Sequence, residues 1–126
     1  MKKRVVFNSR YQSEGNIQAQ LVHLLCKTGI SIRINASFIV PEKTHYVKGH
    51  LKESKNRIYP DITLVNENEQ PIHLIETKGL ATTQIVRMGN YQRDRYQKLT
   101  GIPCDLVHSQ TNLSVYVKKL KKKINS

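Results

Sequence analysis

The spacing of apolar residues predicts helices at three places in the chain. From a candidate N-cap at Ser13, apolar residues recur on one helix face, namely Ile17, Leu21, Leu24 and Leu25. Gly29 can end this helix in the left-handed conformation. The same spacing predicts a second helix over 82–99, closed by Gly101, and a final basic helix over 112–124.

Alternating or short apolar runs predict strands between these helices, over 30–40, 58–66, 71–77 and 103–108. The polar stretch 41–57 separates the first two strands, and a short hairpin around Gly49 can interrupt it. The expected order is αβββαβα. Because the two middle strands are apolar on both sides, helices should cover both faces of a mixed central sheet. We therefore expect one α/β domain over residues 1–126.

Three ionisable residues, Asp61, Glu76 and Lys78, lie within the two apolar middle strands. A buried charge costs several kcal/mol unless it is paired or binds a metal. If a four-residue connection pairs Asn66 with Pro71, Asp61 faces Glu76 directly, and Lys78 shares their side. Two adjacent carboxylates repel unless a cation lies between them, and Mg²⁺ accepts carboxylate and phosphate oxygens. A one-residue slip would place the carboxylates on opposite faces.

Pro60-Asp61, followed fifteen residues later by Glu76-Thr77-Lys78, resembles the PD-(D/E)XK nuclease superfamily. Its members include restriction endonucleases, Holliday-junction resolvases, type I restriction nuclease domains and RecB-type nucleases. The resemblance covers roughly residues 13 to 109. It implies a restriction-endonuclease-like αβββαβ core, here with an added C-terminal basic helix. It also implies Mg²⁺ (or Mn²⁺) held by Asp61, Glu76 and the Thr77 carbonyl, a water oriented by Lys78, and a 5′-phosphate product.

Glu14 is a candidate for a further metal ligand. It precedes Ile17 by three residues and Leu21 by seven, so it lies on the apolar stripe of the first helix. Acidic residues of the first helix bind metal in many relatives of the superfamily it resembles. The alternative is an acid in the first turn that only complements the helix dipole.

Gln92 and Tyr96 are candidates for catalytic roles on the second helix. They are four residues apart on a predicted inward stripe with Ile85, Met88 and Leu99. This spacing resembles a motif that follows the ExK strand in RecB-type and type I restriction nucleases. A buried amide and phenol could position a phosphate, a water or Lys78. The alternative is a partly exposed helix in which Gln92 contacts solvent.

The charge of the chain indicates a polyanionic partner. It carries 21 Lys and Arg against 9 Asp and Glu, a net charge of +12, which favours nucleic acid. The resemblance to the nuclease superfamily implies that this nucleic acid is DNA. Each basic residue could also be a solvated surface charge. The candidate DNA contacts are Lys43, Lys48, Lys52, Lys55, Arg57, Arg87, Arg93, Arg95 and Lys98.

No apolar run approaches the roughly 20 residues of a membrane span, so we expect no membrane contact. Cys26 and Cys104 match no metal spacing and are expected to be buried free thiols in a reducing cytoplasm. With no separate recognition domain, a homodimer is expected to address two DNA strands. The expected function is a metal-dependent, structure- or site-specific DNA endonuclease, of a junction-resolving, phage or mobile-element type. The alternatives are a non-catalytic nucleic-acid-binding protein with this fold and an RNA binder of ribosomal type.

Overall fold

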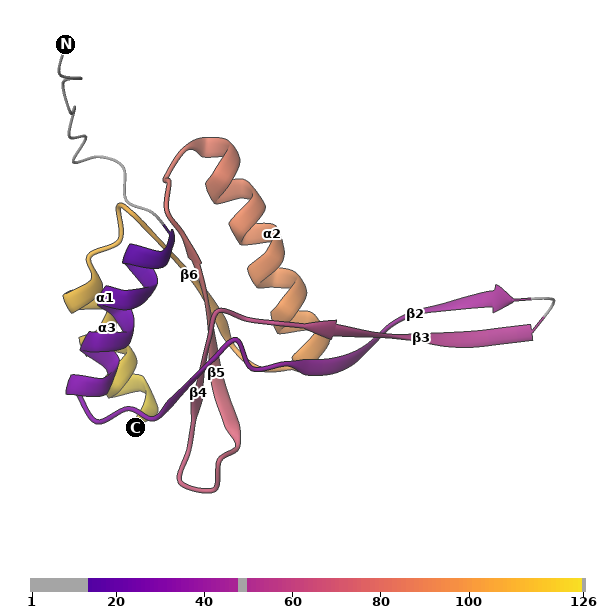
Figure 1. The fold of residues 1–126 in the computed structure, drawn as a ribbon, viewed down its shortest axis with the longest axis horizontal. Helices are drawn as coiled ribbons and strands as arrows, with labels where there is room; N and C mark the ends of the chain where they lie inside the picture. The colour runs from indigo at the N-terminus through magenta and orange to yellow at the C-terminus, as the bar shows by residue number, and fades with distance from the viewer. Residues whose placement is uncertain (1–13, 48–49, 126) are drawn as a thin grey trace, which may run out of the picture.

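The structure is a computed structural model that describes the backbone of residues 14–47 and 50–125 (Figure 1). Side chains are described for residues 15–40 and 57–125. The elements are α1 (Glu14–Lys27), β1 (Ile32–Ile34), β2 (Phe38–Val47), β3 (His50–Ile58), β4 (Ile62–Val65), β5 (Pro71–Lys78), α2 (Thr83–Thr100), β6 (Cys104–His108) and α3 (Leu113–Ile124).

The described strands form two sheets. The larger is four-stranded, in the order β1-β4-β5-β6, and the smaller is the β2-β3 pair. The β1-β4 and β4-β5 pairs are antiparallel, whereas β5 and β6 are parallel. A parallel pair needs a crossover connection, and α2 supplies it between β5 and β6. The prediction of an α/β fold with a mixed sheet is confirmed.

Helices cover both faces of the four-stranded sheet, as predicted (Figure 1). On one face, α1 and α3 pack over a cluster of buried residues that includes Leu21, Leu64, Ile75 and Val117. On the other face, α2 packs over a smaller cluster, which includes Ile58, Leu74, Tyr96 and Cys104. We call these the α1/α3 face and the α2 face. Among the described residues, no helix has the length and apolar character needed to span a membrane.

The predicted helix ends agree closely with the structure. The Thr82 hydroxyl accepts a hydrogen bond from the backbone of Ile85 and caps α2. Gly101 follows α2 with a φ of 71°, and Gly29 follows α1 with a φ of 80°. Both glycines adopt the left-handed conformation that ends a helix.

The predicted strand over 30–40 is wrong as a single element. Asn35 has a positive φ of 54°, and the chain turns there. Before the turn, β1 pairs with β4, and after it β2 pairs with β3. Apolar alternation continues through the turn, so the periodicity alone could not reveal the break.

The predicted short hairpin around Gly49 is instead a long one. β2 and β3 pair from Phe38↔Ile58 to Val47↔His50, and this arm projects away from the four-stranded sheet (Figure 1). The polar composition of 41–57 concealed it, since a two-stranded arm needs no apolar core. Of the predicted DNA contacts, Lys48 lies outside the described residues, as do the side chains of Lys43, Lys52 and Lys55.

The predicted strand over 58–66 is also broken. β3 ends at Ile58, and β4 begins only at Ile62, so Asp61 precedes a strand rather than lying within one. Pro60 lacks an N–H and favours such an interruption. The predicted register holds at the centre, where Ile62 pairs with Ile75. A bulge then shifts it, so that Val65 rather than Asn66 pairs with Pro71.

Two burial predictions are wrong. Met88, predicted to face inward, is 56% exposed, and its neighbour Gly89 is buried against Leu106 of β6. The close approach at Gly89 sets the rotation of α2 and turns Met88 outward. Cys26 is exposed, although Cys104 is buried as predicted. Burial raises the pKa of the Cys104 thiol to about 12, so that thiol stays protonated.

Candidate functional site

Hydrogen bonds join Asp61 and Glu76 at the start of β4 and the end of β5. The backbone N–H of Asp61 donates to Glu76 Oε1 at 3.2 Å. The backbone N–H and the hydroxyl of Thr77 donate to Asp61 Oδ2 at 2.7 and 2.9 Å. Each carboxylate is therefore held by the other's strand, and the two lie beside each other.

Glu76 and Lys78 belong to the α2 face of the sheet. Ile62 and Ile75, the adjacent paired residues, pack into the α1/α3 cluster. Because side chains alternate along a strand, Glu76 and Lys78 of β5 lie on the opposite side. Asp61 precedes β4, and its carboxylate contacts Thr77 at the edge of this face. Glu76 is only 3% exposed, whereas Asp61 is half-buried. These charged side chains therefore lie where the β4-β5 pair meets α2.

The donor set suits a hard divalent cation. Two carboxylates on adjacent segments offer the oxygen ligands that Mg²⁺ prefers. Within the part of the chain that the structure describes, no group of three or more His, Cys, Asp and Glu side chains is gathered at one point. Glu14, the predicted further ligand, begins α1, but its side chain lies outside the described residues. The described residues therefore supply two carboxylates.

Gln92 and Tyr96 of α2 come together over this face. The Gln92 amide donates to the Tyr96 hydroxyl at 2.7 Å, and Tyr96 is 5% exposed. Burial raises the pKa of Tyr96, and the negative charges of Glu76 and Asp61 raise it further despite the hydrogen bond from Gln92. The phenol therefore stays neutral and keeps its own proton for an acceptor.

Lys78 lies at the wall of a cavity of about 580 Å³ beside α2. This volume is within the range of pockets that bind small molecules or parts of larger ligands. The charged residues that line it are all basic. The lining residues are Lys78, Arg87, Met88, Tyr91, Gln92 and Arg95. We call this the α2 cavity.

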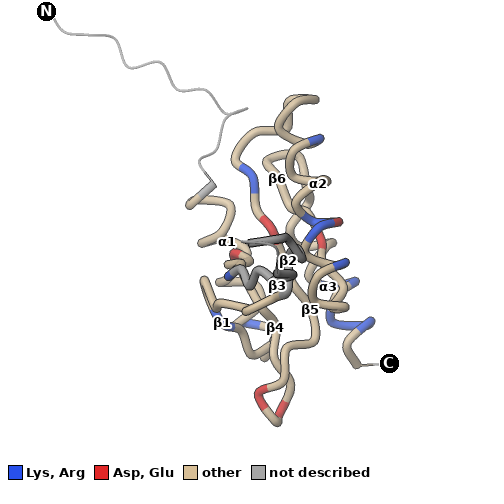
Figure 2. The backbone as a smooth tube through the Cα atoms, turned by 90° about the vertical axis from the view of Figure 1, so that its right-hand side faces the viewer, with Lys and Arg blue, Asp and Glu red and all other residues tan. Residues whose placement is uncertain are grey.

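The predicted DNA contacts on α2 divide into two groups. Arg87 and Arg95 line the α2 cavity together with Lys78. Arg93 instead pairs with Asp94, with its guanidinium 3.0 Å from the carboxylate, and Lys98 is exposed near the end of the helix. Arg57 is exposed at the end of β3. Figure 2 shows basic residues along α2 and α3 and acidic residues at the tip of the β4-β5 connection.

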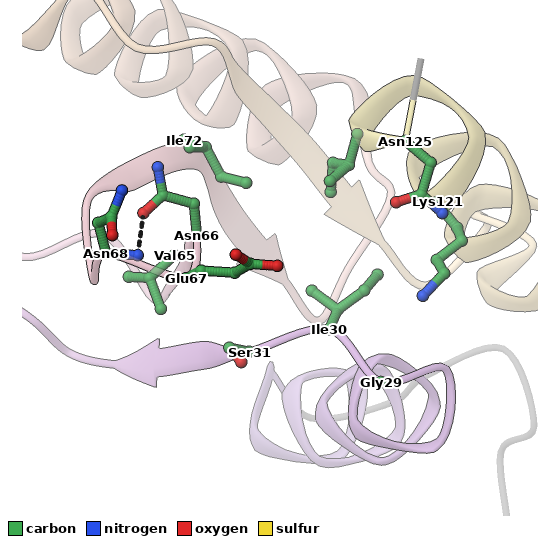
Figure 3. Close-up of a pocket in the computed structure, with 11 residues that line it drawn as sticks. Gly29, Ile30, Ser31, Val65, Asn66, Glu67, Asn68, Ile72, Lys121 and Asn125 are labelled. Carbon is green, nitrogen blue, oxygen red and sulfur yellow. Dashed lines mark hydrogen bonds between the residues drawn. The ribbon is translucent and has the colours of Figure 1, made fainter.

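A second cavity, of about 510 Å³, lies between the end of α1, the β4-β5 connection and the end of α3 (Figure 3). Its polar groups already support the fold. Lys121 donates to the carbonyl of Thr28 at 2.6 Å and so caps α1. Asn66 Oδ1 accepts from the backbone N–H groups of Asn68 and Gln70, each at 2.9 Å. This cavity is therefore a structural junction.

A polar network on the α1/α3 face was not predicted from the sequence. His73 Nε2 lies 2.7 Å from Asp105 Oδ2, and the Tyr116 hydroxyl donates to the same oxygen at 2.7 Å. His73 is 3% exposed. Strand alternation places His73 away from Glu76, but no pattern in the sequence connects it to residues of β6 and α3.

Tyr91 had no predicted role, and Met88 was predicted to lie in the core. Both line the α2 cavity, and both are exposed. A signal for Tyr91 was present in the sequence, since Arg87, Tyr91 and Arg95 are spaced four residues apart and so share one helix face.

Compared with known proteins, the chain matches no family model, no curated protein and no solved structure.

Proposed function

We propose that the protein is a metal-dependent DNA endonuclease of the PD-(D/E)XK type. The observation that carries this proposal is the contact between Asp61 and the Glu76-Thr77 segment through three hydrogen bonds, with Lys78 two residues beyond Glu76. Charge placed in this way costs folding free energy, and metal-assisted phosphoryl chemistry accounts for it. A second support is the element order. Without the β2-β3 arm, α1, β1, β4, β5, α2 and β6 follow the αβββαβ order of that superfamily.

In this proposal Asp61, Glu76 and the Thr77 carbonyl would hold Mg²⁺ or Mn²⁺, with Glu14 as a further ligand. When bound, such an ion supplies Lewis acidity and lowers the pKa of a coordinated water. The Thr77 hydrogen bonds fix the orientation of the Asp61 carboxylate. Lys78 orients the attacking water and stabilises negative charge on the phosphate oxygens. Cleavage would leave a 5′-phosphate.

Gln92 and Tyr96 act as positioning residues in this mechanism. Their mutual hydrogen bond fixes the phenol above the sheet. A neutral phenol donates to a phosphate oxygen or a water without adding charge. The amide of Gln92 faces the α2 cavity as well, so this pair links the carboxylates to the space that would receive the substrate.

The basic surface supports DNA as the substrate. The net charge is +12, and Arg87 and Arg95 lie beside Lys78. The β2-β3 arm is a two-stranded ribbon, and the major groove of DNA admits such a ribbon. Lys43, Lys52 and Lys55 are on this arm. A homodimer would give one such site for each strand of a duplex, and we place the enzyme in the cytoplasm.

A non-catalytic nucleic-acid-binding protein is the second candidate. The observation that favours it is the basic surface, with a net charge of +12 and Arg87 and Arg95 lining the α2 cavity, which would bind nucleic acid without any metal. Such a protein would use the same basic surface without cutting.

Cleavage assays separate these two functions. Purified protein is incubated with supercoiled plasmid, linear duplex, single strand and a four-way junction, with Mg²⁺, with Mn²⁺ or with EDTA. We expect metal-dependent cutting that is lost in Asp61→Ala and Lys78→Ala. Lys122→Ala on α3 is the matched control, because it removes one exposed charge away from the site. Binding without cutting on every substrate and with either metal would contradict the endonuclease.

A further inference from the structure

We infer that the α2 cavity receives an unpaired nucleotide, so that the substrate carries single-stranded DNA at the point of cleavage. The inference rests on the proposed function, because it assigns the cavity to the same substrate. It narrows the substrate from any DNA to DNA with an unpaired segment, as at a junction, a flap or an overhang.

The first argument is the exposure of apolar groups in the α2 cavity. Tyr91 is 73% exposed and Met88 is 56% exposed, and both line the same space. Single exposed apolar residues are ordinary on a protein surface. Two of them in one cavity provide a flat aromatic surface and an adaptable apolar contact. A nucleobase stacks on such an aromatic ring.

The charges around the α2 cavity also fit a nucleotide. Lys78, Arg87 and Arg95 surround these apolar groups, and the lining residues include no acid. Arg87, Tyr91 and Arg95 share one face of α2 because they are four residues apart. A ligand that combines a flat apolar ring with negative charge fits this arrangement. A nucleotide has both, since its phosphates can contact the arginines while its base contacts the tyrosine.

The α2 cavity also lies in the right place for a nucleotide beside the proposed site of cleavage. Lys78 belongs both to the α2 cavity and to the face that carries Glu76, and Gln92 connects the cavity to Tyr96. A nucleotide in the cavity therefore lies next to the phosphate that Lys78 would contact. In an intact duplex both faces of each base are covered by its neighbours, and reaching a cavity requires unstacking. An unpaired base meets no such cost.

The test is a binding measurement in EDTA, where no metal-dependent cutting interferes. Fluorescence anisotropy follows the full chain binding to labelled oligonucleotides, namely single-stranded dT20, a strand of equal length with abasic sugars, and a duplex. We expect Tyr91→Ala to weaken binding to dT20 on the order of tenfold, as for loss of one stacked base. Tyr91→Phe should bind as the unaltered protein does, because its ring is kept.

Two controls isolate the base contact. Tyr91→Ala should leave binding to the abasic strand and to the duplex unchanged, because the phosphate contacts remain. Val115→Ala, which removes an exposed apolar side chain from α3, should leave binding to dT20 unchanged. Equal losses on dT20 and on the abasic strand, or no loss on dT20, would overturn the inference.

This measurement is independent of catalysis. If Tyr91→Ala behaves as expected while no substrate is ever cut, the endonuclease fails and the unpaired-base site stands. If metal-dependent cutting occurs but Tyr91→Ala binds dT20 like the unaltered protein, the inference fails and the endonuclease stands.

Discussion

The two faces of the central sheet treat buried polar groups in different ways. On the α1/α3 face, His73, Asp105 and Tyr116 satisfy one another within an apolar cluster. At the end of β5, Asp61 accepts hydrogen bonds from Thr77, Glu76 accepts one from the Asp61 backbone, and Lys78 of the α2 face borders an open cavity with basic walls. On one face the polar groups are paired inside the protein, whereas on the other a lysine borders an open cavity.

The difference shows that buried polar residues do not by themselves identify a functional site. The Asp105 network contains a histidine, an aspartate and a tyrosine, residue types that are common in catalysis. Its hydrogen-bonding capacity is nevertheless used within the protein, and Lys123 is the nearby cation. The Asp61-Glu76 pair differs because two like charges lie together beside a basic cavity. That arrangement is hard to explain by folding alone.

Replacing Asp61 or Asp105 by asparagine should give the largest difference, which is a difference in the rate of DNA cleavage. Asp61→Asn removes a proposed metal ligand, and we expect the rate of DNA cleavage to fall at least about 10²-fold, comparable with loss of one transition-state contact. Asp105→Asn, on the opposite face, should retain the cleavage rate per folded molecule. Single-turnover cleavage with Mg²⁺ measures both, and a similar loss in the two variants would break the comparison between the faces.

Removal of the His73 imidazole should lower the stability of the protein and leave its cleavage rate unchanged. His73→Ala leaves the half-buried Asp105 carboxylate with only one of these two hydrogen-bond partners, Tyr116, and we expect the free energy of unfolding to fall by about 1–3 kcal/mol. Urea denaturation followed by circular dichroism gives this value. The cleavage rate at saturating folded protein should be unchanged. If His73→Ala is as stable as the unaltered protein, the network does not support the α1/α3 face.

The close contact at Gly89 tests how α2 is seated over the carboxylates. A Cβ added there would lie 2.7 Å from Leu106 Cδ1. Since Ala favours a helix while the clash disfavours it, we expect a net destabilisation of about 1 kcal/mol for Gly89→Ala. Leu106→Ala in the same chain should relieve the clash, so the two substitutions should not be additive. Additive effects would show that α2 does not approach β6 at this point.

The smallest expected effect is that of acid, which should reduce the contribution of Asp105 to the free energy of unfolding. Burial alone would raise the pKa of Asp105, but hydrogen bonds from His73 and Tyr116 outweigh it and hold the pKa below its ordinary 3.8. A carboxylate with a lowered pKa adds stability above pH 3.8 and loses it as the pH falls further. The difference in unfolding free energy between the unaltered protein and Asp105→Asn should therefore shrink below pH 3.8. A difference that grows there would contradict the lowered pKa.

Local patterns predicted much of this molecule. The apolar spacing located all the described helices, and the register between β4 and β5 placed Asp61 beside Glu76. That success depended on strand alternation, which is a property of the backbone. The breaks at Asn35 and Pro60 were missed because one residue's conformation can end a strand without changing its apolar pattern.

Contacts between distant segments could not be predicted from local patterns in the sequence. Asp105 reaches His73 across the parallel β5-β6 pair and Tyr116 across a loop. No local spacing encodes those distances. Met88 was assigned to the core because its helical phase fits, but packing of Gly89 on Leu106 rotates α2. The same rotation creates the α2 cavity, so tertiary contact decides where the proposed substrate would lie.

The central claim is that Asp61 and Glu76 hold one divalent cation on the α2 face. Crystals soaked with Mn²⁺ test it directly through the anomalous scattering of the metal. We predict a peak bounded by the two carboxylates and the Thr77 carbonyl in the unaltered protein, and none at that place in Asp61→Asn. A crystal in which Mn²⁺ never occupies that position, or in which the two carboxylates point apart, would contradict the account.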